Sequence, residues 1–274
     1  MYAPPSTVNR IAAIVSGKSR VSDVLPDGAV SDMPWRKAGV KYTQNEIYFD
    51  IVEEIDAIVD ERGQMVSCEV NGAIHGNCRL SGIPDLTMVF TDPSVIDDCS
   101  FHLCVRYSRY TASLMQYRVQ VQQLMPPIYC QPSVSYTDRG VGSLELMIGQ
   151  HHMPTLVANS VKKAYNAEDI TVEMTFPKSV RTVDANTDVG SCLFDDSTKV
   201  NPKKILTPTL KGHIVLQQGA AIPDEKPIVL LGFKVPMTTV SGLTVETLVL
   251  SNERYKPYKG VRTLTKAGRF QIRT

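Results

Sequence analysis

The chain has 274 residues, with 29 basic and 28 acidic side chains and a formal net charge of +1. This balance excludes a general attraction to nucleic acid, and six cysteines in a chain this long do not make a disulfide-held scaffold. No stretch approaches the roughly 20 apolar residues that span a bilayer, and residues 1–10 are not a signal peptide, so we expect a cytoplasmic protein.

Residues 1–34 mix Pro, Gly, Ser and Asp with one weakly apolar turn at residues 11–15. Such a composition is typical of a connecting segment rather than of a packed element. It predicts a linker with room for a short helix.

The first strong pattern is the stretch 45–60, N-E-I-Y-F-D-I-V-E-E-I-D-A-I-V-D. Its odd positions are apolar except for Glu53, as in a strand with one buried face. A helical stripe also fits these residues. The Gly-containing turn at 61–64 and the alternation at 66–70 favour a β-hairpin, so we predict a strand.

From residue 35 onward, apolar or β-branched runs end at turn residues, as at 86–90, 170–176, 214–218 and 228–235. This rhythm predicts an all-β sandwich or barrel. Prolines bracket the middle third of the chain. We therefore predict a second β lobe, residues 123–236, inserted into a first lobe made of residues 35–122 and 237–274.

The end of the chain is basic. Residues 251–274 hold seven Lys or Arg residues against Glu253 alone, which could meet an acidic partner or anionic lipid, or simply form a solvated strand face. Residues 261–265 and 269–273 flank Lys266-Ala267-Gly268, and this pattern predicts a final hairpin beside the opening strand.

The sequence holds no catalytic constellation. Its nearest approach to a metal site is Cys99-x-x-His102-x-Cys104, which lacks a second pair of ligands and is read as ordinary strand packing. We therefore predict no enzyme activity, no metal and no cofactor.

A binding role remains, because an exposed sheet edge can take an extended peptide as an extra strand. The opening strand offers Tyr48 and Asp50 on one face and Ile47 and Phe49 on the other, and the last strand could add Arg262. An aromatic ring, a carboxylate and a guanidinium together suit a tyrosine side chain. The alternative is an Asp50–Arg262 ion pair that only stabilises an edge.

Several ordered motifs resemble the mu homology domain of clathrin-associated adaptor medium subunits, and the first and last are most similar to the complex-3 branch. They are P-W-R-K-A-G-V-K-Y-T-Q-N-E-I-Y-F-D-I-V-E-E-I-D-A-I (34–58), L-S-G-I-P-D-L (80–86), I-D-D-C-S-F-H-x-C-V-R (96–106), S-G-L-T-V-E-T-L (241–248) and Y-K-P-Y-K-G-V-R-T-L-T-K-A-G-R-F-Q-I-R-T (255–274).

The resemblance implies an elongated fold of two immunoglobulin-like β-sandwich lobes, the second inserted into the first. It also implies binding of Tyr-x-x-Φ sorting signals, where Φ is a bulky apolar residue, in cytosolic tails of membrane cargo bound for the lysosome or vacuole. The implied partners are two large subunits and one small subunit of an adaptor complex, peripheral on Golgi or endosomal membranes.

Carried over by position, the resemblance places Tyr48, Asp50 and Arg262 around the signal's tyrosine. It places the remaining residues around the Φ pocket, with the Lys259 stem at its rim: Ile47, Phe49, Val245, Leu248 and Val261. This chain departs from several relatives at Gly260, where they have a Trp that stacks on the tyrosine, and at Asn77, where some have a Lys.

Other family features are expected to be missing. The resemblance leaves no N-terminal longin-like domain in this chain, and strands near residues 109–116 and 200–201 look skipped. Such losses would bare strand edges. They motivate an alternative, a scaffold that contacts membrane or coat partners through its basic end without binding signals.

Overall fold

The computed structural model describes residues 39–101, 112–120, 125–137, 140–151, 166–188, 191–193, 199–201 and 209–274. The chain divides into two units, residues 1–40 and residues 41–274, and the description below concerns the second unit. The predicted linker at 1–34 lies outside the described residues. Within those residues the elements are strands and one 3-10 helix, which confirms the predicted all-β class.

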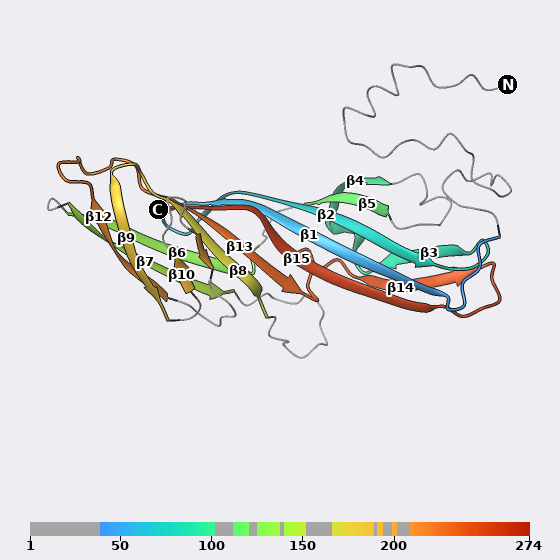
Figure 1. Cartoon of the computed structure of the whole chain (residues 1–274). Helices are drawn as coiled ribbons and strands as arrows, with labels where there is room; N and C mark the ends of the chain where they lie inside the picture. The colour runs from blue at the N-terminus through green and yellow to red at the C-terminus, as the bar shows by residue number, and fades with distance from the viewer. Residues whose placement is uncertain are drawn as a thin grey trace, which may run out of the picture. The chain divides into compact units, whose positions relative to one another are not determined.

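The strands in chain order are labelled in Figure 1 where there is room. They are β1 (Glu46–Val59), β2 (Met65–Arg79), β3 (Asp85–Phe90), β4 (Ile96–Phe101), β5 (Ala112–Val119), β6 (Ile128–Tyr136), β7 (Val141–Gln150), β8 (Glu168–Thr175), β9 (Val180–Thr187), β10 (Ser191–Leu193), β11 (Lys199–Asn201), β12 (Thr209–Leu216), β13 (Ile228–Pro236), β14 (Val245–Ser251) and β15 (Tyr258–Arg273), with the 3-10 helix η1 (Pro93–Val95) before β4.

The opening stretch is a strand, as predicted, and not a helix. Along β1 every second side chain is buried, from Ile47 to Val59, and the residues between them are partly exposed. The turn to β2 is closed by Asp60, whose Oδ1 accepts from the backbone N–H groups of Arg62 at 2.9 Å and Gln64 at 2.7 Å. Gly63 takes a left-handed φ of 79°, which glycine adopts without strain. The predicted hairpin is confirmed.

Nine strands form the largest sheet, in the order β10-β11-β8-β13-β15-β1-β2-β5-β4. Its strand β1 pairs antiparallel with β2 and parallel with β15. The first and last of the described strands therefore run side by side (Figure 1). This pairing brings the segments predicted to bind a peptide together.

The predicted C-terminal hairpin is wrong, because residues 258–273 form one continuous strand. Gly268 marks an irregularity inside β15: the pairing with β1 shifts between Ile55 and Ala57, and the backbone N–H of Arg269 donates to Asp56. A glycine in a strand can mark a bulge as well as a turn. The predicted place of this strand, beside the opening strand, is confirmed.

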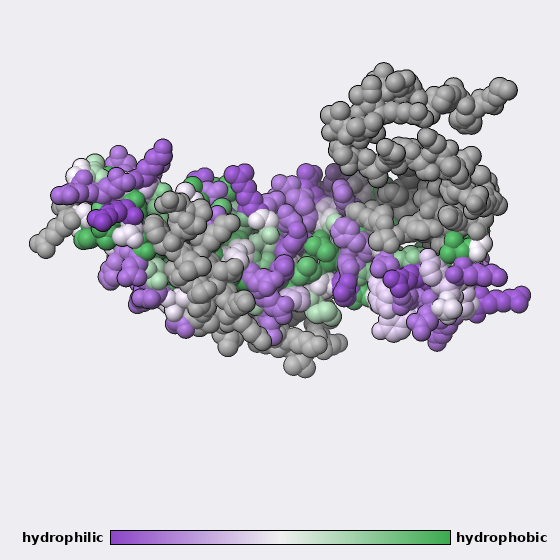
Figure 2. All heavy atoms as spheres, viewed as in Figure 1, coloured by the Kyte–Doolittle hydropathy of each residue, from purple (hydrophilic) through white to green (hydrophobic). Residues whose placement is uncertain are grey.

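Two smaller sheets complete the described fold. Strands β6-β7-β12-β9, all between residues 128 and 216, form a four-stranded sheet, and β14 pairs with β3. Hydrophilic residues predominate on the visible surface of the described part, with smaller hydrophobic areas between them (Figure 2). The lobe boundaries given above stay a prediction.

The two places where strands were expected to be missing lie next to β5 and β11. Strand β5 pairs with both β2 and β4, and β11 pairs with β8 and β10. The segments 102–111 and 202–208 that adjoin these strands lie outside the described residues.

Candidate functional site

Asp50 and Arg262 are register partners across the parallel β1–β15 pair. The guanidinium donates from Nε to Oδ1 at 2.7 Å and from Nη2 to Oδ2 at 2.9 Å, so the contact is bidentate. It raises the pKa of Arg262, first through this hydrogen bond and then through the charge of Asp50. The Arg262 side chain is 72% exposed and that of Asp50 37%, so both remain within reach of a ligand.

Tyr48 lies one step along the same face, paired with Gly260 on β15 and Asn77 on β2. Its ring leans over Gly260, where an added Cβ would come within 2.8 Å of Tyr48 Cδ1. The hydroxyl donates to Glu46 Oε2 at 3.1 Å, which is the main cause of the raised Tyr48 pKa. Glycine at position 260 therefore leaves the space that the Tyr48 ring occupies.

A second tyrosine was missed by the sequence analysis. Tyr258 lies two residues before Gly260, on the same face, and its ring centroid is 5.8 Å from that of Tyr48. Its side chain is 67% exposed. Strand alternation from Gly260 and Arg262 could have placed Tyr258 on this face.

The predicted apolar residues of β1 and β15 lie on the opposite face of these strands, whereas Val245 and Leu248 lie on β14, which pairs with β3 in a separate sheet. Ile47 and Phe49 are buried, and the half-buried side chains that pack against the same core include Val245, Leu248 and Val261. Lys259 crosses to β14, where its Nζ donates to the Leu248 carbonyl. Eight of the ten predicted residues are thus register partners on β1 and β15, residues 47–50 and 259–262, and Leu248 joins them through Lys259. Val245 is placed by its pairing with Phe90 on β3.

One edge of β15 is open beside these residues. On the side away from β1, β13 pairs with β15 only from Leu264 onward, and Met237 N–H donates to the Thr263 carbonyl at 2.8 Å. Along residues 258–262 no described strand pairs on that side. Such an edge can accept an extended peptide as a further strand.

A buried carboxylate lies behind the site. Glu53, the one charged residue among the inward positions of β1, has 0% exposure. It accepts hydrogen bonds from the Tyr117 hydroxyl at 3.0 Å, from Ser241 N–H at 3.0 Å and from the Ser241 hydroxyl. Burial raises the Glu53 pKa, and these hydrogen bonds oppose that rise. The network fixes the loop that leads into β14.

Metal binding finds no support in the part of the chain that the structure describes. Cys99 is exposed on β4, and its two predicted companions, His102 and Cys104, lie outside the described residues. Among described residues no group of three or more His, Cys, Asp or Glu side chains could hold a metal ion. None of the described helices is long and apolar enough to cross a membrane.

The basic end of the chain is partly neutralised by β1. Besides the Arg262–Asp50 pair, Lys266 Nζ contacts Glu54 Oε2 at 2.5 Å. These contacts reduce the positive charge with which the chain, in the alternative scaffold function, would contact an anionic membrane.

The fold is that of a mu homology domain. The described sheets match the Fcho1 mu homology domain of Danio rerio with a bound Eps15 peptide, at a TM-score of 0.57 and 12% identity over 86% of this chain and 99% of that one. They also match the yeast delta-COP-I mu-homology domain complexed with a Dsl1 WxWxV peptide, at a TM-score of 0.57 and 14% identity over 85% of this chain and 100% of that one.

The chain belongs to the adaptor complexes medium subunit family, whose sequence profile matches residues 33–274. It is 39% identical to the AP-3 complex subunit mu of Dictyostelium discoideum over 296 residues, 100% of this chain and 68% of that one. It is also 39% identical to the AP-3 complex subunit mu-2 of Rattus norvegicus over 297 residues, with the same coverage.

Membership of this family confirms the resemblance drawn from the motifs and makes the chain an adaptor subunit of vesicle transport rather than an enzyme. Both alignments are longer than the 274 residues of this chain, so each relative holds residues that it lacks. That difference agrees with the expected internal losses, although it does not locate them.

Proposed function

We propose that this chain is the cargo-recognition part of an adaptor complex and binds Tyr-x-x-Φ signals in the cytosolic tails of membrane proteins. It works with two large subunits and one small subunit, peripherally on Golgi or endosomal membranes, in transport to the lysosome or vacuole. Similarity to AP-3 mu subunits supports the assembly. The peptides bound to two similar domains support a peptide ligand.

The observation that carries the proposal is the arrangement of the predicted residues beside the open edge of β15. The residues predicted to bind the tyrosine lie on one face, and those predicted to bind Φ lie on the other. In an extended peptide, successive side chains point to opposite faces, so residues three apart also lie on opposite faces. A tyrosine that meets Asp50 and Arg262 on the outer face therefore directs Φ toward Val261 and Leu248 on the other. The three-residue spacing of the signal fits this geometry.

The ion pair at the site retains the capacity to bind a phenol. Each Asp50 oxygen accepts one bond from Arg262 and has a lone pair left, and two of the five guanidinium N–H donors are used. A tyrosine hydroxyl can donate to Asp50 and accept from Arg262 at the same time. Both bonds are charge-assisted and therefore stronger than neutral ones.

Isothermal titration calorimetry with a Tyr-x-x-Leu peptide tests the proposal. The parent chain should bind it, and replacement of either the tyrosine or the leucine of the peptide by Ala should abolish detectable binding. Equal heats for the parent peptide and the two substituted peptides would contradict the proposal.

A further inference from the structure

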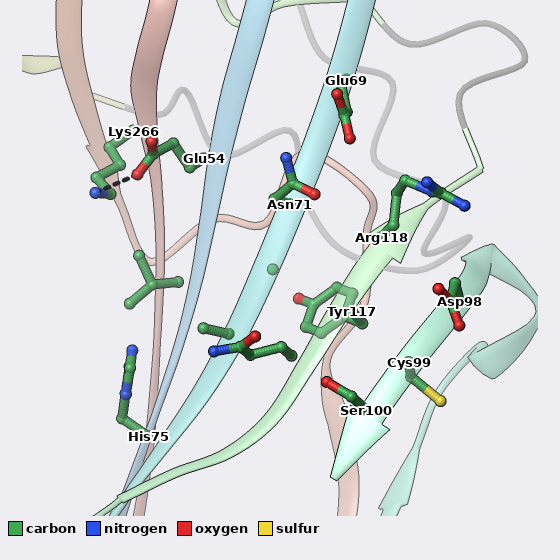
Figure 3. A pocket seen from close by; sticks show the side chains of 14 residues that line it. Glu54, Glu69, Asn71, His75, Asp98, Cys99, Ser100, Tyr117, Arg118 and Lys266 are labelled. Atoms are coloured by element: carbon green, nitrogen blue, oxygen red, sulfur yellow. Dashed lines mark ion pairs between the residues drawn. The ribbon is translucent and has the colours of Figure 1, made fainter.

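A hollow of about 550 Å³ lies on the outer face of the nine-stranded sheet, next to the candidate site. Its floor includes Val52 and Ala73, which are register partners on β1 and β2. In Figure 3 the Glu54–Lys266 ion pair stands along one side, and Arg118 and Asp98 stand along the other.

The hollow begins where the candidate tyrosine site ends. His75 lines it and is the register partner of Asp50, so the two side chains are neighbours on one face. Figure 3 shows His75 at one end and Glu69 at the other. These residues are six apart on β2, about 20 Å at 3.3 Å per residue, so the hollow has the length of about six extended residues.

The direction of a bound signal follows from its two anchors. If the tyrosine is placed level with Arg262, a Φ directed toward Leu248 comes level with Lys259, whose Nζ donates to the Leu248 carbonyl, so the peptide runs antiparallel to β15. Residues before the tyrosine are therefore directed toward Leu264, where β13 already occupies the edge. The inner face is closed there by the fully buried Thr265. The outer face of the sheet, with the hollow, is open to them.

The charges along the hollow favour a basic segment. Lys266 is paired with Glu54, and Arg118 with Asp97 outside the lining. Glu69 and Asp98 line the hollow and have no ion pair among the described residues. Two carboxylates are thus left to attract a cation, while the cations present are already matched.

We propose that this hollow binds the residues that immediately precede the signal tyrosine in the same cargo tail, and that it prefers Lys or Arg there. The inference rests on the proposed function and adds to it a second contact region on the outer face of β1, β2, β5 and β4. It identifies the flanking sequence as a determinant of which tails are bound.

The test uses the full chain and three peptides that share one Tyr-x-x-Leu signal and carry two Lys, two Ser or two Glu residues before the tyrosine. An exposed ion pair gives roughly a 2- to 5-fold gain in affinity for each basic residue. We therefore expect the order Lys, then Ser, then Glu by calorimetry, with smaller differences at high salt.

Charge reversal distinguishes the hollow from the general charge of the domain. The double variant Glu69→Lys and Asp98→Lys should invert the order of the three peptides. A matched double variant, Asp184→Lys and Glu225→Lys, changes the net charge equally at exposed positions outside the lining of the hollow and should leave the order unchanged.

Three results would overturn the inference. Equal affinities for the three peptides, with binding still dependent on the tyrosine, would show that the hollow does not bind the preceding residues. The proposed function would be unaffected. The same inversion in both double variants would mean that charge acts at long range. Failure of the parent chain to bind any of the peptides would overturn the proposed function as well.

Discussion

Asp50 and Arg262 are 212 residues apart in the sequence, yet they form a bidentate ion pair at 2.7 and 2.9 Å across two parallel strands. An exposed pair of this kind contributes at most about 1 kcal/mol to folding. Stability alone therefore gives little reason for the arrangement, whereas a tyrosine hydroxyl would find both a donor and an acceptor in it.

Removal of the peptide hydroxyl should mimic loss of Asp50. A Phe-x-x-Leu peptide should bind the parent at least about 10- to 150-fold more weakly than the Tyr peptide, because one hydrogen bond to a charged group has that value and the hydroxyl can make two. In the Asp50→Ala variant, the change from the Tyr to the Phe peptide should reduce affinity much less, because the peptide hydroxyl has lost the Asp50 carboxylate as its partner. Additive losses in this double-mutant cycle would mean that the hydroxyl binds elsewhere.

Phosphorylation of the signal tyrosine should abolish binding. A phosphate carries a charge of about −1.5 to −2 and would face the Asp50 carboxylate at short range. Titration with a phosphotyrosine peptide checks this expectation, with the unmodified peptide as the control. Tighter binding of the phosphorylated peptide would show that Arg262 dominates the site.

Tyr258 should contribute to affinity through its ring. Aromatic pairs add about 0.5–1.5 kcal/mol beyond burial, so Tyr258→Ala should weaken the Tyr-x-x-Leu peptide roughly 2- to 13-fold. Tyr258→Phe keeps the ring and should bind like the parent. Since the side chain is exposed, neither change should alter the melting temperature by more than a few degrees. Equal affinity for all three proteins would exclude Tyr258 from the site.

Glu53 should be a large contributor to stability near the site. Glu53→Leu leaves the Ser241 N–H and the Tyr117 hydroxyl without their acceptor, each at about 1–3 kcal/mol, whereas Glu53→Gln keeps one acceptor oxygen. Urea denaturation measures both variants. The exposed neighbour variant Glu54→Gln, which loses only the contact to Lys266, should cost at most about 1 kcal/mol and serves as the control.

The same carboxylate gives a pH dependence with a defined sign. Its pKa is raised above the ordinary value of 4.5, so the folded protein binds this proton more tightly than the unfolded chain. The stability of the parent relative to Glu53→Gln should therefore fall as pH rises from about 4.5 through the raised pKa. A difference that is flat or rises over this window would mean that Glu53 is not the group responsible.

The strand pattern of β1 could be predicted from the sequence because its alternation is unusually regular, and Glu53 was visible there as an exception. The place of the C-terminal segment beside β1 could also be predicted, and with it an Asp50–Arg262 pair, but the parallel direction and the register could not, since nothing local specifies them.

The error at the C-terminus has a local cause. Lys266-Ala267-Gly268 has the composition of a turn, but pairing with β1 on one side and β13 on the other keeps β15 extended, and Gly268 becomes an irregularity within it. His75 was missed because its place beside Asp50 depends on the register between β1 and β2, which the sequence does not state, whereas Tyr258 could have been found by alternation along β15.

The most direct test compares Asp50→Ala with Glu145→Ala in calorimetric titrations with one Tyr-x-x-Leu peptide. Glu145 forms an exposed ion pair with Lys211 at 3.0 Å on the four-stranded sheet, so both variants lose an exposed ion pair. We predict a loss of about 10- to 150-fold for Asp50→Ala and parental affinity for Glu145→Ala. Parental affinity for Asp50→Ala would contradict this prediction.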